Sequence, residues 1–122
     1  MINIYGSSRY KISKKSLRNF AQSLLERYQI GKIAVVNIML VGKRKMTQIS
    51  TTYKGEHEAL PVLSFSYYQD KTIADNIIGE VVICYPQAVL LAAQREKKVD
   101  DMFKLLVEHG IQNLFIKRII GL

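Results

Sequence analysis

The sequence predicts an α+β (mixed α/β) domain, in which a roughly four-stranded mixed sheet packs with about four helices. Short β-favouring runs and amphipathic helical stretches follow one another in the order β-α-β-α-β-β-α-α. The length of 122 residues fits one domain, and no linker, repeat or low-complexity tract divides the chain. A content of 48% hydrophobic and 23% charged residues is ordinary for a globular protein. We therefore expect a single domain over residues 1–122.

The first half of the chain contains two predicted strands, each followed by a helix. Met1–Tyr5 has the pattern of a short strand. Ser13 is a favourable N-cap for a helix over Lys14–Tyr28, whose apolar residues recur at i, i+3, i+4 and i+7. Ile33–Val41 is a near-continuous β-favouring run, which predicts a strand buried on both faces. A second helix is expected over about Lys43–Tyr53.

The second half predicts two strands followed by two helices. The strands are Val62–Tyr68 and Ile77–Tyr85, separated by a polar loop. A third helix is expected over about Pro86–Lys97, because proline suits the first turn of a helix. Asp100 and Asp101 open a fourth helix, where their negative charge favours an N-terminus.

Positive charge is concentrated in the first half of the chain. The formal net charge is +8, but residues 1–55 hold eleven Lys and Arg against one acid, hence +10. Residues 56–122 hold seven basic and nine acidic residues, hence −2. Such an asymmetry indicates a half that binds a polyanion, most often nucleic acid. Lys43, Arg44 and Lys45 begin the second helix; either they attract a phosphate there, or solvent and salt merely screen their unfavourable interaction with the helix dipole.

Few residues could carry catalysis or bind a metal. The chain has one cysteine, Cys84, and two histidines, His57 and His109, so a disulfide within the chain is excluded and a Cys/His zinc module is nearly excluded. Cys84 is expected to be a small buried apolar residue. No apolar run reaches the ~18 residues of a membrane span, and the N-terminus lacks a signal-peptide pattern. We therefore expect a soluble, cytoplasmic protein.

Three segments resemble the YbeY family of rRNA maturation factors and endoribonucleases. Residues 49–65, ISTTYKGEHEALPVLSF, resemble the family pattern L-N-x-x-Y-R-G-x-x-x-x-T-D-V-L-S-F without a gap, and Tyr53, Gly55 and residues 62–65 match it. Lys54 stands in place of a functional arginine, Leu60 in place of the threonine and Pro61 in place of the aspartate. Residues 78–83, IGEVVI, resemble L-G-D-I-x-I, and residues 106–114, LVEHGIQNL, resemble L-x-x-H-G-x-L-H-L. The order and spacing agree over most of the chain. The resemblance implies a YbeY-like fold and, for the family, zinc-dependent cleavage of RNA.

The zinc signature of the family, H-G-x-L-H-L-x-G-x-D-H, is degenerate in this chain. His109 keeps the first ligand, whereas Asn113 replaces the second histidine and Ile119 the third. Ile116 replaces the glycine at which the chain turns, and Arg118 replaces the aspartate. One imidazole and one amide do not provide the three or four ligands that zinc sites need, so we expect no bound metal.

The fourth helix is expected to run on past the family's turn. Residues 114–120 contain neither glycine nor proline, and helix propensity gives no reason to stop at Phe115. We therefore expect the helix to continue towards Ile119 or Ile120, which would carry Ile119 away from a ligand position.

Charge and resemblance together predict a minimal, divergent YbeY-like protein that binds single-stranded RNA in rRNA maturation or ribosome quality control. Any endoribonuclease activity would be weak or metal-independent, with His109 transferring protons and Lys54 holding the phosphate. The expected partners are rRNA and the ribosome. The alternative is a non-catalytic adaptor for the ribosome or a protein, which kept the fold and lost the metal site. The residues expected to contact RNA are Lys43, Arg44, Lys45, Lys54, Lys14, Lys15 and Arg18, and the aromatic residues that could stack on bases are Tyr53, Phe65, Tyr67 and Tyr68.

Overall fold

The computed structural model describes residues 1–67 and 76–119, the last four of these by their backbone only. These residues form four strands and four helices in the predicted order, which confirms the α+β class. The elements are β1 (Ile2–Tyr5), α1 (Lys14–Arg27), β2 (Val35–Val41), α2 (Lys43–Lys54), β3 (Val62–Ser66), β4 (Ile77–Cys84), α3 (Tyr85–Gln94) and α4 (Val99–Ile119).

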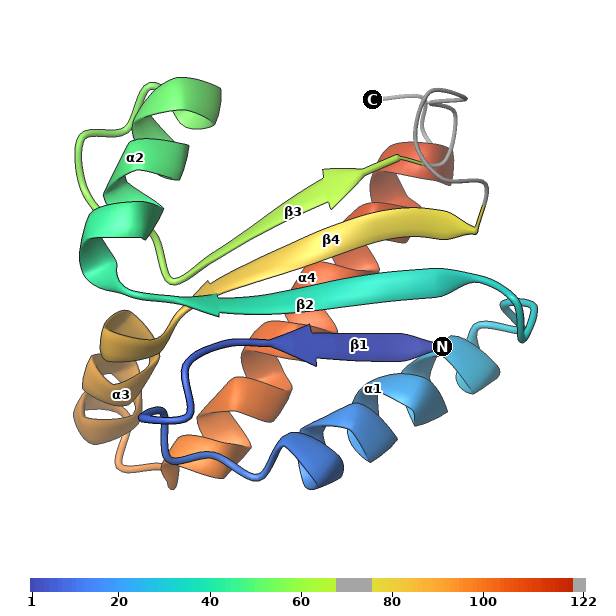
Figure 1. Ribbon diagram of the computed structural model, residues 1–122, viewed down its shortest axis with the longest axis horizontal. Helices are drawn as coiled ribbons and strands as arrows, with labels where there is room; N and C mark the ends of the chain where they lie inside the picture. The colour runs from blue at the N-terminus through green and yellow to red at the C-terminus, as the bar shows by residue number, and fades with distance from the viewer. Residues whose placement is uncertain (68–75, 120–122) are drawn as a thin grey trace.

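The strands form one mixed sheet in the order β1-β2-β4-β3 (Figure 1). β1 pairs with β2 and β2 with β4 in parallel, whereas β3 pairs with β4 in the antiparallel direction. Ile38 of β2 lies opposite Val81 of β4, and Val81 lies opposite Ser64 of β3. β1 and β3 are therefore the edge strands of the described sheet. Ile38, Val81 and Ser64 point to the same face of the sheet, as do the residues two positions before and after each of them on its strand.

That face carries the larger core, because α1 and α4 pack against it (Figure 1). Ser13 caps α1 as predicted: its Oγ accepts a hydrogen bond from the Ser16 backbone N–H at 3.2 Å. The core contains alternate residues of β2 and β4 together with the apolar stripes of the two helices. Its buried side chains include Leu17, Ala21, Leu24, Leu25, Val36, Ile38, Leu40, Val81, Ile83, Phe103, Val107, Ile111 and Leu114.

Two glycines let α4 lie close against β4. A Cβ on Gly110 of α4 would lie 2.5 Å from Val81 Cγ1, and a Cβ on Gly79 of β4 would lie 2.6 Å from Leu114 Cδ2. Both distances are far below van der Waals contact. Beside this contact the Ser64 hydroxyl donates a buried hydrogen bond to the Gly110 carbonyl oxygen at 2.8 Å. The glycines in the two family-like segments IGEVVI and LVEHGIQNL, Gly79 and Gly110, are therefore needed for the close packing of α4 on β4.

The opposite face of the sheet is only partly covered. α2 lies over one end of it, where Met46, Leu63, Val82 and Cys84 form a second, smaller core with Ala59. Towards the other end, no helix within residues 1–67 and 76–119 lies over this face (Figure 1). The expectation that β2 is buried on both faces is therefore wrong: its residues alternate between buried and half-buried, because α2 is too short to cover the second face.

Several predicted boundaries also shift. β2 begins at Val35 rather than Ile33, whose side chain is 78% exposed. α3 ends at Gln94 rather than Lys97, where Glu96 takes a left-handed φ of 53°. α4 runs to Ile119, which confirms the predicted extension, while Ile120 lies outside the described residues. Over the described ranges, every helix is too short or too polar to cross a membrane.

Candidate functional site

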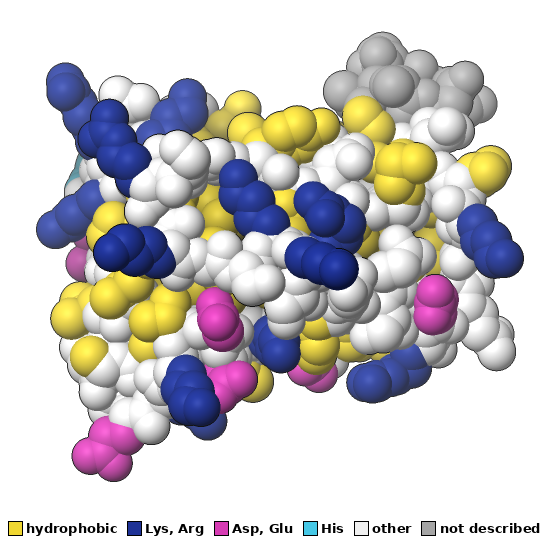
Figure 2. Space-filling model, turned by 60° about the horizontal axis from the view of Figure 1, so that its bottom comes forward, with side chains coloured by type: hydrophobic (Ala, Val, Ile, Leu, Met, Phe, Trp, Pro, Cys, Tyr) yellow, Lys and Arg dark blue, Asp and Glu magenta, His cyan; other side chains and the backbone are white. Residues whose placement is uncertain are grey.

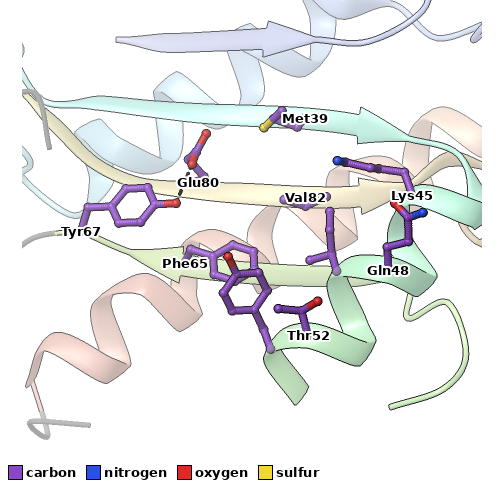
Figure 3. Close-up of a pocket in the computed structure, with 10 residues that line it drawn as sticks. Met39, Lys45, Gln48, Thr52, Phe65, Tyr67, Glu80 and Val82 are labelled. Carbon is purple, nitrogen blue, oxygen red and sulfur yellow. Dashed lines mark hydrogen bonds between the residues drawn. The ribbon is translucent and has the colours of Figure 1, made fainter. Parts of the chain in front are cut away.

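The open part of the second sheet face contains a groove between α2 and the strands (Figure 3). Its volume is about 430 Å³, within the range of about 300–1,000 Å³ that is usual for small-molecule sites. One wall comes from the strands and from Tyr67, which follows β3, and the other wall comes from α2. The lining residues are Met39, Phe65, Tyr67, Glu80 and Val82 from the sheet side and Lys45, Gln48, Ile49, Thr52 and Tyr53 from α2.

The groove has an acidic end and a basic end. At one end the Tyr67 hydroxyl donates a hydrogen bond to Glu80 Oε1 at 2.6 Å. At the other end Lys45 and Gln48 reach over the sheet from α2 (Figure 3). Apart from Thr52, the side chains between the two ends are apolar or aromatic. A ligand with hydrogen-bond donors at one end, an apolar middle and a negative charge at the other end would complement this groove.

Aromatic rings form part of the wall. Tyr53 and Phe65 meet edge to face, with ring centroids 5.0 Å apart and planes at 70°. The Tyr53 side chain is 66% exposed, whereas Phe65 is half-buried and also packs against the smaller core. Phe65 therefore belongs to the core and to the groove. Exposed aromatic faces beside a cation are the usual means by which proteins stack nucleic-acid bases.

Three predicted cations lie beside this groove. Lys43, Arg44 and Lys45 are exposed in the first turn of α2, where the N-cap Gly42 provides no side-chain hydrogen bond and no acidic residue occurs in the first turn. Lys45 also lines the groove itself. The structure thus brings a run of positive charge and an aromatic-lined groove to the same face of the sheet.

The predicted cations of α1 lie on the other face of the sheet. Lys15 and Arg18 are exposed, whereas Lys14 is half-buried and donates a hydrogen bond from Nζ to the Gly6 carbonyl oxygen at 3.1 Å. Figure 2, which brings the α1 side forward, shows Lys and Arg side chains spread widely over this face, with acidic side chains mainly in its lower part. The α1 and α2 cations therefore do not form one patch, and the role of the α1 residues in RNA binding stays a prediction.

The two predicted catalytic residues come from helices on opposite faces of the sheet. Lys54 is exposed at the end of α2, followed by Gly55 in a left-handed conformation with φ 67°. His109 is exposed on α4, since the helical repeat turns it away from the core residues Val107 and Ile111. The Ser64–Gly110 hydrogen bond holds this turn of α4 beneath β3. Only a ligand that wraps around the β3 edge would contact both Lys54 and His109.

The donor set around His109 does not fit zinc. Asn113, one turn further on, is half-buried and offers an amide, and Ile119 has no donor atom in its side chain. Among residues 1–67 and 76–115, whose side chains are described, no group of three or more His, Cys, Asp and Glu side chains could hold a metal ion. That this protein works without zinc stays a prediction.

Other candidate residues divide between core and groove. Cys84 is buried, as expected, and burial raises the pKa of its thiol, which disfavours a nucleophilic role. From the sequence, Asp70, Asp75 and Glu80 could form a cluster of carboxylates, although solvated loop charges are the favoured interpretation of Asp70 and Asp75. Asp70, Asp75 and Tyr68 lie outside the described residues. Sequence reasoning missed the groove, although one signal was present: Glu80 is the only charged residue of an otherwise apolar strand.

Comparison with known proteins agrees with the sequence patterns. A family model described as "Endoribonuclease YbeY" matches residues 3–115. Proteins named endoribonuclease YbeY are 29% identical over 79 residues in Alteromonas mediterranea, 28% over 99 in Methylococcus capsulatus and 30% over 97 in Neorickettsia sennetsu. These matches cover 65%, 81% and 80% of this chain, and 50%, 63% and 67% of the respective relatives. The chain thus spans about half to two thirds of their length.

A solved structure shares the fold. The solution structure of TM1509 from Thermotoga maritima superposes with a TM-score of 0.61 at 24% sequence identity. The superposition covers 93% of this chain and 71% of that one. The strand order and the packing of α4 beneath β3 and β4 therefore belong to a fold that other sequences also adopt.

Proposed function

The chain belongs to the YbeY family, and from this premise we propose that it binds single-stranded RNA in rRNA maturation or ribosome quality control. The observation that carries the proposal is that Lys45 lines an aromatic groove on the open face of the sheet, next to Lys43 and Arg44. A cationic path beside stacking surfaces is the common design of proteins that bind single strands. The proposed partners are rRNA and the ribosome, and the proposed place of action is the cytoplasm.

The proposed RNA surface runs from the first turn of α2 along the groove, with Lys54 at the far end of the same helix. Lysine keeps the positive charge of the arginine that the family has at this position but loses its two-pronged contact with phosphate. Affinity is therefore expected to arise mainly from many weak phosphate contacts and to fall steeply with salt.

A charge-reversal experiment tests this surface. Binding of a fluorescein-labelled single-stranded RNA 12-mer is measured by anisotropy over a series of salt concentrations. The triple variant Lys43→Glu, Arg44→Glu and Lys45→Glu should bind more weakly at every salt concentration, and its log–log salt slope should flatten by about 0.7 per lost phosphate contact. An unchanged affinity and salt slope would remove α2 from the RNA surface.

The matched control reverses three exposed charges of α1. The variant Lys15→Glu, Arg18→Glu and Arg27→Glu changes the net charge by the same amount on the opposite side of the sheet. If α2 holds the RNA and α1 does not, the α1 variant should lose less affinity than the α2 variant and keep its salt slope. An equal loss of affinity and salt slope in both variants would mean that α2 is not the specific RNA surface, either because the predicted α1 cations also bind RNA or because net charge alone attracts it.

We further propose that any RNA cleavage by this chain is weak and independent of metal. His109 would take the proton from the 2′-hydroxyl as its oxygen attacks phosphorus, and Lys54 would neutralise the charge that develops on the phosphate. The bond from phosphorus to the 5′-oxygen of the next nucleotide would break, and that oxygen would leave with a proton from water. The products would be a 2′,3′-cyclic phosphate and a 5′-hydroxyl end. Both residues are exposed, so both are accessible to an RNA that passes around the β3 edge.

The second candidate function is a non-catalytic ribosome- or protein-binding adaptor. The position of Lys54 and His109 on opposite sheet faces favours it, because one phosphate must meet both residues for the reaction above. Cleavage of single-stranded RNA with and without chelator separates the two functions. Chelator-resistant cleavage that His109→Ala abolishes and His57→Ala preserves supports the enzyme. Absence of cleavage with RNA or ribosome binding intact supports the adaptor.

A further inference from the structure

We propose that the groove on the open sheet face takes a flipped-out guanine base of the bound RNA and that Glu80 selects it. This inference rests on the proposed RNA binding and adds a base preference to it. The groove is separate from His109, which lies on the other side of the sheet.

The chemistry of the Glu80 carboxylate is the first reason. An ionised carboxylate only accepts hydrogen bonds, and its two oxygens together offer about four acceptor sites. Tyr67 occupies one site on Oε1, and Glu80 has no other hydrogen-bond partner within the described part of the chain. The oxygens can therefore accept further hydrogen bonds from a ligand in the groove.

The second reason is that guanine alone offers two adjacent donors. Its Watson–Crick edge presents N1–H and the exocyclic N2 amino group side by side, which matches the two oxygens of a carboxylate. Adenine and cytosine present one amino group beside an unprotonated ring nitrogen, and uracil presents one N–H between two carbonyl oxygens. Each of these bases would bring an acceptor against the carboxylate, which is repulsive.

The third reason is the order of groups along the groove. The middle is apolar and aromatic, with Met39, Val82 and Phe65 between Glu80 and the α2 residues (Figure 3). A base whose donors meet Glu80 would stack on this stretch, and the phosphate of its nucleotide would extend towards Lys45. A carboxylate, a stacking surface and an ammonium group in this order are the complement of a guanine nucleotide.

Oligonucleotide binding tests the base preference. The probes are fluorescein-labelled U12 and the same strand with one central G, A or C. Wild-type protein should bind the G-containing strand about tenfold more tightly than U12, since two hydrogen bonds to a charged acceptor are gained. Glu80→Gln should reduce this preference to about twofold, because the amide repels one of the two donors, whatever its effect on the affinity for U12.

The matched control is Glu58→Gln, which makes the same charge change in an exposed loop outside the groove. It should keep the full preference for G. If wild-type protein does not distinguish G from the other bases, or if Glu80→Gln and Glu58→Gln behave alike, the proposal is wrong. The four probes could also bind equally and weakly, with an affinity that the charge reversal in α2 lowers. That result would reject the guanine site and retain the proposed RNA binding.

Methionine methyl NMR provides a second readout that needs no variant. Met39 lines the groove, whereas the side chains of Met46 and Met102 are fully buried. Addition of GMP to protein with ¹³C-methyl-labelled methionine should shift the Met39 signal and leave Met102 unchanged, and UMP should shift Met39 much less. Equal effects of GMP and UMP would overturn the preference. A GMP-specific shift together with absence of RNA binding would retain the guanine site and reject the RNA function.

Discussion

Substitution of Gly110 by alanine should destabilise the protein, although alanine is the better helix former. Gly110 lies inside α4, where alanine would by itself stabilise the helix by about 1 kcal/mol. The added methyl, however, would lie 2.5 Å from Val81 Cγ1, 3.1 Å from Val81 Cγ2 and 3.2 Å from Ser64 Oγ. Either α4 or the sheet must move to remove the overlap.

The magnitude follows from the contacts. Overpacking a close-packed core costs about 1–3 kcal/mol. A shift of α4 away from the sheet also lengthens the buried Ser64–Gly110 hydrogen bond of 2.8 Å, at a cost of about 1 kcal/mol. After subtraction of the helix-propensity gain, Gly110→Ala should lower the free energy of unfolding by about 1–3 kcal/mol. For a chain of this size the melting temperature should fall by about 4 °C for each kcal/mol.

Urea unfolding followed by circular dichroism measures this loss, provided the m-value is unchanged. Gly31→Ala is the control, because a Cβ at Gly31 has no heavy atom within 4 Å, and it should change stability by less than about 0.5 kcal/mol. In a Val81→Ala background the clashing methyls are gone, so the Gly110→Ala cost should shrink towards zero. A Gly110→Ala protein as stable as wild type, or more stable, would refute the close approach of α4 to β4.

Two smaller predictions follow from local contacts. Ser13→Ala removes the N-cap of α1 and should lower the free energy of unfolding by about 1 kcal/mol in urea, whereas Ser16→Ala leaves the cap oxygen in place and should cost less. Cys84 should resist a thiol reagent in the native protein and react once urea unfolds it, because burial raises its thiol pKa; rapid native labelling would contradict this. The same raised pKa means that the unfolded chain loses its thiol proton first, so the contribution of Cys84 to stability should decline as pH rises through the ordinary thiol range.

The sequence by itself determined the elements and their order, since their signals lie within a few neighbouring residues. The apolar repeat of α1 and its Ser13 cap sit inside one segment, and so does the glycine-free run that lets α4 reach Ile119. The sequence alone also showed the charge asymmetry, which indicated a polyanion-binding half, and the three YbeY-like segments, which indicated the family. Element ends were less accurate, as at Ile33 and Lys97, because the last turn or residue depends on what packs against it.

Only the tertiary structure decided which of these residues meet. Lys45 and Glu80 are far apart in the sequence, and the pairing of β2 with β4 and the packing of α2 on their outer face place both in one groove. The similar cations of α1 end up on the other side of the sheet, which composition does not reveal. Periodicity shows which face of a segment is buried, but a groove forms only where part of a sheet face stays uncovered. How much of the face α2 covers depends on its contacts with strands that are distant in the sequence, and a local pattern does not contain this information.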